Sequence, residues 1–237
     1  MAKTVGLSRK ITLQWLNKAV ELREANLTEE EYKTKMNEYL SFEIGSPTNL
    51  RKTREILMRL WFYEDDQIVT QIRNEALPLI KKHPDYAMPI HWCIMLVSYP
   101  VFADLSRLMS KIAEFNDVII LSQLKQKLFD EWGERSTLYH STDKIIQTIK
   151  ELGVITANKP GKYTIIKHTV SNSEIVEFML HVALKVDGNS YYSFTELNDF
   201  AVLYPFDYQV SREIVTSDEM IVCSNLGGEL SVALKEM

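Results

Sequence analysis

Residues 136–167 read STLYHSTDKIIQTIKELGVITANKPGKYTIIK, and this stretch decides the interpretation of the fold. We expect a short helix over residues 136–140, followed by a second helix that Thr142 caps and that carries its isoleucines on one face. Gly153 ends this helix. The residues that follow alternate as in a hairpin, with the turn at residues 158–161.

The segment just before this stretch predicts one more helix. Asp117 can cap it, apolar residues recur at helical spacing, and Gly133 directly follows Trp132 at its end. A helix, a short helix, a further helix and a two-stranded hairpin follow one another in this order in a winged helix-turn-helix. We therefore expect a winged-helix-like segment after residue 116.

Helical patterns fill the chain before that segment. Thr28 and Glu31 match a capping box, Ser46 and Pro47 predict a helix start, and Asp65 or Asp66 can cap the next helix. The predicted fold class is thus mainly α. Residues 1–116 would form a helical bundle and residues 117–237 a second part, with the change of pattern near residue 116 as the boundary.

The last part of the chain predicts more helices and a final hairpin. The helices are expected over residues 174–186, 193–203 and 209–215, and the hairpin strands over residues 220–223 and 229–234. The turn of this hairpin would fall at Asn225-Leu226-Gly227-Gly228, because glycines favour the tight turns between paired strands.

One stretch, residues 87–103, has no Asp, Glu, Lys or Arg and approaches the length of a membrane span. Pro89 and Pro100 divide it, and His91 would bring a polar group into lipid. We expect a helix buried in a protein core and no membrane partner. The first residues lack a signal-peptide pattern, so we expect a cytoplasmic protein.

The overall charge is the wrong sign for a protein that coats nucleic acid. The 237 residues include 27 Lys and Arg against 32 Asp and Glu, a formal net charge of −5. The acidic excess is concentrated at residues 171–237, with 3 basic and 11 acidic groups. Residues 1–60 hold 11 basic and 8 acidic groups, and residues 121–170 hold 8 and 5. Two separate segments are therefore basic.

The first basic segment contains the predicted third helix, NLRKTREILMRLWF. Arg51, Lys52 and Arg59 fall on one side of it, opposite an apolar side. They could contact phosphates, and Arg54 lies in the same run. Alternatively this is an ordinary solvated face, because Glu55 has the i, i+4 spacing to pair with Arg51 and Arg59.

The second basic segment is the winged-helix-like one. Its candidate DNA contacts are Lys144 and Gln147 on the helix and Lys159 and Lys162 on the hairpin. The hairpin lysines could instead protect an edge strand from aggregation. Few side chains suit base edges, so we expect weak sequence specificity.

No motif indicates an enzyme. The sequence lacks the G-x-S-x-G, Walker and dinucleotide-binding patterns. The five histidines show no H-x-x-x-H pair, and we find no carboxylate at metal-ligand spacing. Cys93 and Cys223 lie in apolar runs, which argues against a disulfide framework and a zinc site. We expect no catalytic residues, no metal and no cofactor.

Several ordered segments resemble the BrxA family of bacterial BREX phage-exclusion systems. They are the basic third helix, MLVSYPVFADL, LKQKLFDEW, STLYHSTDKIIQTIKELGVI and SNLGGELSVAL. The resemblance implies a non-enzymatic, cytoplasmic protein that binds double-stranded DNA and functions with other BREX subunits in antiviral defence. The alternative is an interaction scaffold that docks partner subunits without binding DNA.

Overall fold

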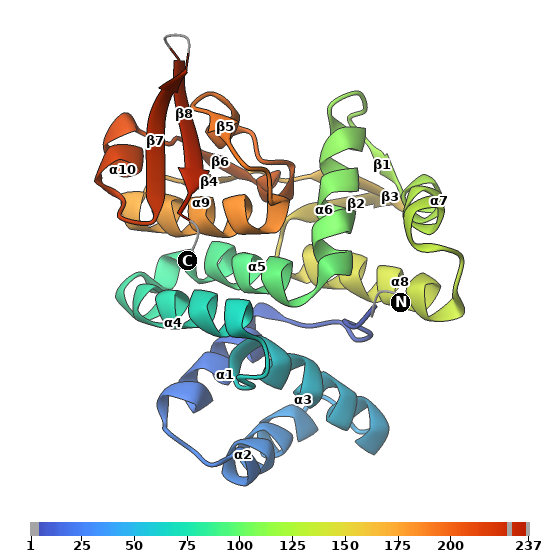
Figure 1. Ribbon diagram of the computed structural model, residues 1–237. Coiled ribbons are helices and arrows are strands. Elements are labelled where there is room, and N and C mark those ends of the chain that lie inside the picture. Colours follow the sequence, from blue (N-terminus) through green and yellow to red (C-terminus); the bar gives the residue numbers. More distant parts are fainter. Residues whose placement is uncertain (1–4, 227–228, 236–237) are drawn as a thin grey trace.

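The computed structural model describes residues 5–226 and 229–235, and the chain is mainly helical, as the sequence predicts. Its first half consists of helices joined by short connections (Figure 1). They are α1 (Leu13–Glu24), α2 (Glu29–Ser41), α3 (Pro47–Trp61), α4 (Gln67–Lys82), the 3-10 turn η1 (Pro84–Tyr86), α5 (Ala87–Ser98) and α6 (Pro100–Ala113).

The predicted helix starts in this half are confirmed. Thr28 and Glu31 form the reciprocal capping box of α2. The side chains of Ser46 and Asp66 accept hydrogen bonds from the first turns of α3 and α4. These caps satisfy backbone amides that have no partner within the helix, which is why local sequence locates them well.

After α6 the chain forms a small three-stranded sheet, and two helices lie between its first and second strands along the sequence. The elements are β1 (Ile119–Ile120), α7 (Leu121–Trp132), α8 (Ser136–Glu151), β2 (Ile155–Lys159) and β3 (Lys162–Ile165). The strands are antiparallel in the order β1-β3-β2, with Ile120 opposite Lys162 and Thr156 opposite Thr164.

Two details of this region were predicted wrongly. Asp117 does not cap α7, because residues 119–120 pair with β3 first and the Leu121 amide donates to the Gly161 carbonyl. The two helices expected over residues 136–152 are one continuous helix, α8. Thr142 is buried inside it and donates a hydrogen bond to the Leu138 carbonyl at 2.8 Å, so its hydroxyl is not a cap.

The remaining chain folds over α5. It comprises β4 (His168–Val170), α9 (Ser173–Asp187), β5 (Tyr192–Ser193), η2 (Glu196–Asn198), η3 (Ala201–Leu203), β6 (Phe206–Tyr208), α10 (Arg212–Ser217), β7 (Ile221–Leu226) and β8 (Glu229–Leu234). Strands β4 and β6 are parallel, and the other sheet has the order β5-β8-β7. Gly227 and Gly228, part of the predicted turn, lie outside the described residues.

The prediction of a helix over residues 193–203 is wrong. Tyr192 and Ser193 pair with β8 instead, and the Glu196 carboxylate accepts hydrogen bonds from both the amide and the hydroxyl of Ser193. The chain then continues as the 3-10 turns η2 and η3, and η3 packs against α6. Pairing with a distant strand overrides the local helical pattern here.

Helix α5 lies at the centre of the hydrophobic core, which also includes side chains from α1, α3, α6, α8 and α9. It packs against α9 on one side and α4 on another (Figure 1). Within residues 5–226 and 229–235, no single helix has both the length and the apolar composition to cross a membrane. Within these residues, only two consecutive segments taken together are long and apolar enough, and the chain bends by 115° between them. These segments are Pro84–Ser98 and Pro100–Ala113.

Candidate nucleic-acid interface and a carboxylate-histidine cluster

The basic residues predicted on α3 differ in their surroundings. Arg51 and Lys52 are exposed, and neither pairs with any side chain in the described part of the chain. Arg59 is half exposed and lies 3.9 Å from the Asp65 carboxylate across the end of the helix. Arg51 and Lys52 are therefore the residues of this helix whose charge is available to a phosphate.

Arg54 is not available in this way. Its guanidinium donates to Asn37 on α2 and to Glu55, and only 14% of its side chain is exposed. Glu55 also accepts a hydrogen bond from the Tyr63 hydroxyl at 2.8 Å. The pairing of Glu55 with Arg51 and Arg59, on which the alternative of an ordinary solvated face was based, does not form, because Arg54 and Tyr63 bond to its two oxygens.

Helix α8 carries two predicted contact residues on its solvent side. Lys144 is half buried and donates a hydrogen bond to the exposed Gln147 at 3.1 Å. On the same helix, Asp143 forms an ion pair with Lys125 of α7 at 2.6 Å, and the Lys125 ammonium lies 3.5 Å from the centre of the Tyr139 ring. Asp143 is thus neutralised by α7, and Glu151 at the end of α8 pairs with Lys10 at 3.1 Å.

The two hairpin lysines lie at the turn between β2 and β3. Lys159 and Lys162 face each other across the ladder, both are exposed, and within the described residues neither has an ion-pair partner. Gly161 between them has φ +71°, a backbone conformation that favours glycine. Its carbonyl accepts the Leu121 amide at 2.9 Å, so the turn is fixed against the start of α7.

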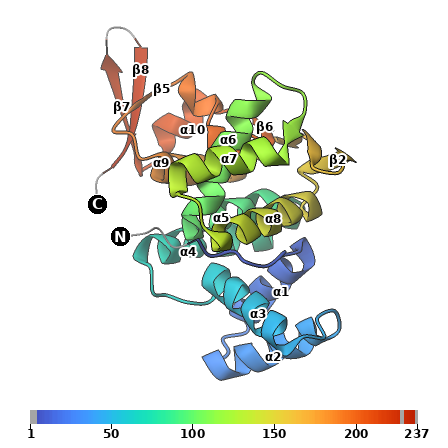
Figure 2. The ribbon, with the colours of Figure 1, turned by 90° about the vertical axis from the view of Figure 1, so that its right-hand side faces the viewer.

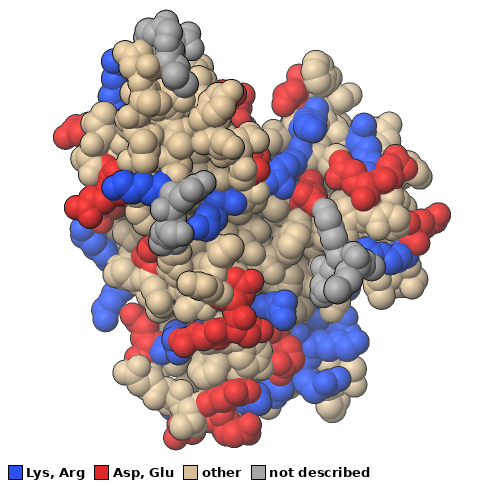
Figure 3. Space-filling model, viewed as in Figure 1, with Lys and Arg blue, Asp and Glu red and all other residues tan. Residues whose placement is uncertain are grey.

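The predicted basic segments lie on one side of the molecule. Figure 2 shows α8 above α3 on the side that faces the viewer, with the chain before α1 between them and the β2 region at the right-hand edge. Two hydrogen bonds join the segment before α1 to α8. The Ile11 amide donates to the Thr148 hydroxyl at 3.0 Å, and the Ser141 hydroxyl donates to the Gly6 carbonyl at 3.1 Å. In Figure 3, basic side chains gather over α3 and over the segment before α1, with acidic side chains beside them.

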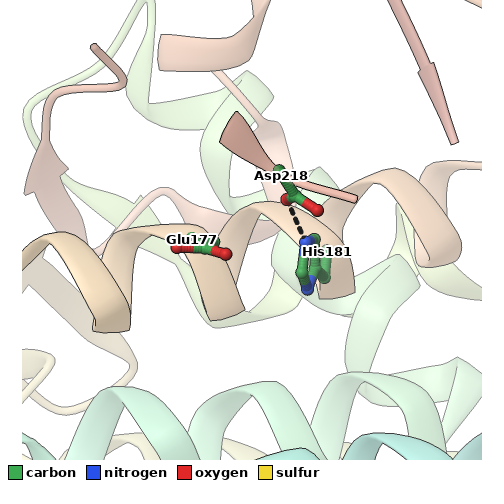
Figure 4. A group of neighbouring side chains, drawn as sticks. All are labelled: Glu177, His181 and Asp218. Carbon is green, nitrogen blue, oxygen red and sulfur yellow. Dashed lines mark hydrogen bonds and ion pairs between the residues drawn. The ribbon is translucent and has the colours of Figure 1, made fainter. Parts of the chain in front are cut away.

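A second group of side chains, which could act as metal ligands, was not predicted. Glu177 and His181 from α9 and Asp218, which follows α10, bring one possible ligand atom each to within 4.8 Å of the others (Figure 4). The Nε2 atom of His181 is hydrogen-bonded to Asp218, and its Nδ1 atom lies 3.5 Å from the Glu75 carboxylate on α4. One imidazole is therefore held between carboxylates from two other elements.

The surroundings change the pKa of two members of this group. Burial disfavours the charged imidazole, but the hydrogen bonds and charges of Glu75 and Asp218 outweigh it and raise the pKa of His181. Burial and the nearby Asp218 raise the pKa of Glu177. A protonated His181 can thus link α4, α9 and the start of β7.

This cluster corrects the statement that no carboxylate has metal-ligand spacing to a histidine. Glu177 and His181 are four residues apart, which places them on the same side of α9. The sequence contains that signal. It does not show that Asp218 and Glu75 meet them, because these residues come from distant parts of the chain.

We expect the contribution of His181 to stability to fall as pH rises. Because its pKa is higher in the folded state, this contribution is present below about pH 6.5 and is lost as pH passes the folded-state value. The substitution His181→Gln should cost about 2–3 kcal/mol at pH 5.5, through loss of the charge-assisted hydrogen bond to Asp218 and of the ion pair with Glu75, and less at pH 9. Urea unfolding of both proteins in a metal chelator measures this difference. A difference that grows with pH would contradict the expectation.

Comparison with known proteins gives no relative from which a role could be transferred: no family model matches the chain, and neither do any curated proteins or solved structures. The resemblance to the BrxA family therefore stays a prediction, and the function must be argued from the residues themselves.

Proposed function

We propose that this protein is a non-enzymatic, double-stranded DNA-binding accessory subunit of a bacterial BREX phage-defence system. The sequence predicted this segment after residue 116 with two helices over residues 136–152, but those are the single helix α8. In this proposal α6, which lies before that boundary, is therefore the first helix of a winged helix that β1, α7, α8, β2 and β3 complete. The observation that supports it is the element order together with the antiparallel sheet β1-β3-β2. This arrangement leaves one side of α8 and the β2–β3 turn open to solvent.

In the proposed complex, α8 enters a groove and the β2–β3 turn contacts the adjoining backbone. Lys159 and Lys162 are suited to phosphates, because both are exposed and neither has an ion pair within the described residues. Helix α3, which carries the exposed Arg51 and Lys52, would extend the contact. Gln147 is the exposed amide that could reach a base edge, so sequence preference should be weak.

The double substitution Lys159→Glu with Lys162→Glu tests the proposal. We expect it to weaken binding to a random-sequence 20-base-pair duplex by about tenfold or more at low salt, because two phosphate contacts become repulsive. The slope of log K against log salt should fall in magnitude by about 0.9 for each lost contact. Fluorescence anisotropy over a salt series measures both quantities.

The matched control is Lys35→Glu with Lys81→Glu, which makes the same change of charge on α2 and α4. Both of these lysines are exposed. If the two double variants weaken binding equally, only overall charge matters and the proposed surface is wrong. If the wild-type protein binds no duplex at low salt but retains a BREX partner protein after nuclease treatment, the scaffold alternative replaces the proposal.

A further inference from the structure

We propose that Glu177, His181 and Asp218 bind a divalent first-row transition-metal ion such as Zn²⁺. Their ligand atoms already lie within 4.8 Å of one another. Metal bonds of about 2.0–2.2 Å require ligand atoms no more than about 4 Å apart. Glu177 can close this gap by rotating, since it is half buried and makes no hydrogen bond in the described part of the chain.

The other ligands are held in place by neighbouring groups. One oxygen of Asp218 accepts a hydrogen bond from the Met220 amide at 2.8 Å, and the other faces His181. Only 3% of the Asp218 side chain is exposed. Glu75 faces Nδ1 of His181, the position from which a carboxylate orients a metal-binding imidazole and leaves Nε2 to the ion.

The charge balance of the cluster favours a cation. Three carboxylates, from Glu75, Glu177 and Asp218, surround one imidazole, which supplies at most one positive charge. Buried charge is costly unless it is balanced. A divalent ion between Nε2, Asp218 and Glu177 would take the place of the proton that Nε2 shares with Asp218. It would lower the formal charge of the three carboxylates and the imidazole from −2 to −1.

The ligand types indicate which ion fits. One imidazole nitrogen with carboxylate oxygens suits Zn²⁺, Mn²⁺ or Fe²⁺, whereas Mg²⁺ and Ca²⁺ favour oxygen ligands alone. Three protein ligands leave a position for water, as in sites that are not purely structural. A hollow of about 350 Å³, lined by Glu177, His181 and Met220 among others, gives the ion access from solvent.

The test is a calorimetric titration of the full-length protein with ZnCl₂ after dialysis against a chelator. We expect one Zn²⁺ per chain and a Zn²⁺-dependent rise of the melting temperature, because an ion that binds the native state stabilises it. Loss of an outer carboxylate typically weakens metal binding by about 10- to 100-fold, which is the expected effect of Glu75→Gln. Glu177→Gln removes a ligand and should weaken binding at least as much.

Glu174→Gln is the matched control. Glu174 lies on the same helix and lines the same hollow, but its carboxylate pairs with Lys82 at 2.6 Å and is not one of the ligand group. Glu174→Gln should therefore change Zn²⁺ affinity much less than Glu177→Gln does. Circular dichroism checks that each variant is folded. The proposal is overturned if the wild-type protein takes up no Zn²⁺ in a saturable 1:1 manner at micromolar concentrations, if Glu177→Gln binds as the wild type does, or if Mg²⁺ binds as tightly as Zn²⁺.

Discussion

Replacing Arg73 by Met is expected to lower the free energy of unfolding by about 3–5 kcal/mol, because buried carbonyls lose their donors. Arg73 belongs to α4, and its side chain is fully buried. Its guanidinium donates to the carbonyls of Leu60 at 2.9 Å, Arg59 at 3.1 Å and Tyr63 at 2.6 Å. Methionine fills a similar volume but supplies no donor.

The large effect follows from where these carbonyls lie. Arg59 and Leu60 are in the last turn of α3, where carbonyls have no amide partner within the helix. A positive charge at this end also interacts favourably with the helix dipole. Burial lowers the pKa of Arg73 to about 10, so the group stays charged at neutral pH. Arg73 thus fixes the C-terminal end of α3, and Arg51 and Lys52 lie in the N-terminal half of the same helix.

Urea unfolding followed by tryptophan fluorescence measures the effect of Arg73→Met. Arg23→Met is the comparison, because Arg23 forms a partly exposed ion pair with Glu64, and such pairs contribute about 0–1 kcal/mol. Arg73→Lys should lie between the two, since an ammonium keeps the charge but not the planar set of donors. If Arg73→Met costs no more than Arg23→Met, the capping role is wrong.

The sequence predicts those parts of the fold that depend on neighbouring residues. The caps at Thr28, Ser46 and Asp66 were predicted because each needs only a side chain and an amide three residues later. The burial of α5 follows from its mostly apolar composition and its lack of charged residues. The end of the helix predicted over residues 174–186 also has a local cause: Gly188 directly follows α9 and takes φ +73°, a conformation that glycine adopts readily.

Features that depend on distant residues could not be predicted. The parallel pairing of β4 with β6 joins His168 to Phe206, and no local pattern specifies it. Residues 193–203 have a helical pattern, but β5 pairs with β8. At Thr142 a residue type that favours helix starts lies inside a helix, because its hydroxyl bonds to the preceding turn.

In the candidate sites, too, the sequence predicts what depends on neighbouring residues and misses contacts between distant parts of the chain. A helical projection places Arg51 and Lys52 on the exposed side of α3, and the structure agrees. It could not show that Arg54 bonds to Asn37 on another helix. The spacing of Glu177 and His181 can be read from the sequence, whereas Asp218 reaches them through the fold of the chain beyond α9.

Replacing Trp92 by Ala is expected to cost about 3–5 kcal/mol, the usual range for removing a large buried aromatic side chain. Trp92 of α5 is fully buried and packs edge-on against Phe102, Tyr204 and Phe206, with ring centres 4.7, 5.7 and 5.9 Å away. Its indole nitrogen donates to the Val202 carbonyl at 2.9 Å. Trp92→Phe keeps an aromatic ring but leaves that carbonyl without this donor, so we expect a loss of about 1–3 kcal/mol.

The way in which Trp92→Ala unfolds tests the division predicted near residue 116. Trp92 lies before that position, whereas Val202, Tyr204 and Phe206 lie after it, so its contacts connect the two predicted parts. If both parts depend on this shared packing, calorimetry should show one transition in the wild type, and the variant should shift it as a whole to lower temperature. Two separate transitions, with only one displaced by Trp92→Ala, would instead identify residues 1–116 and 117–237 as units that unfold independently.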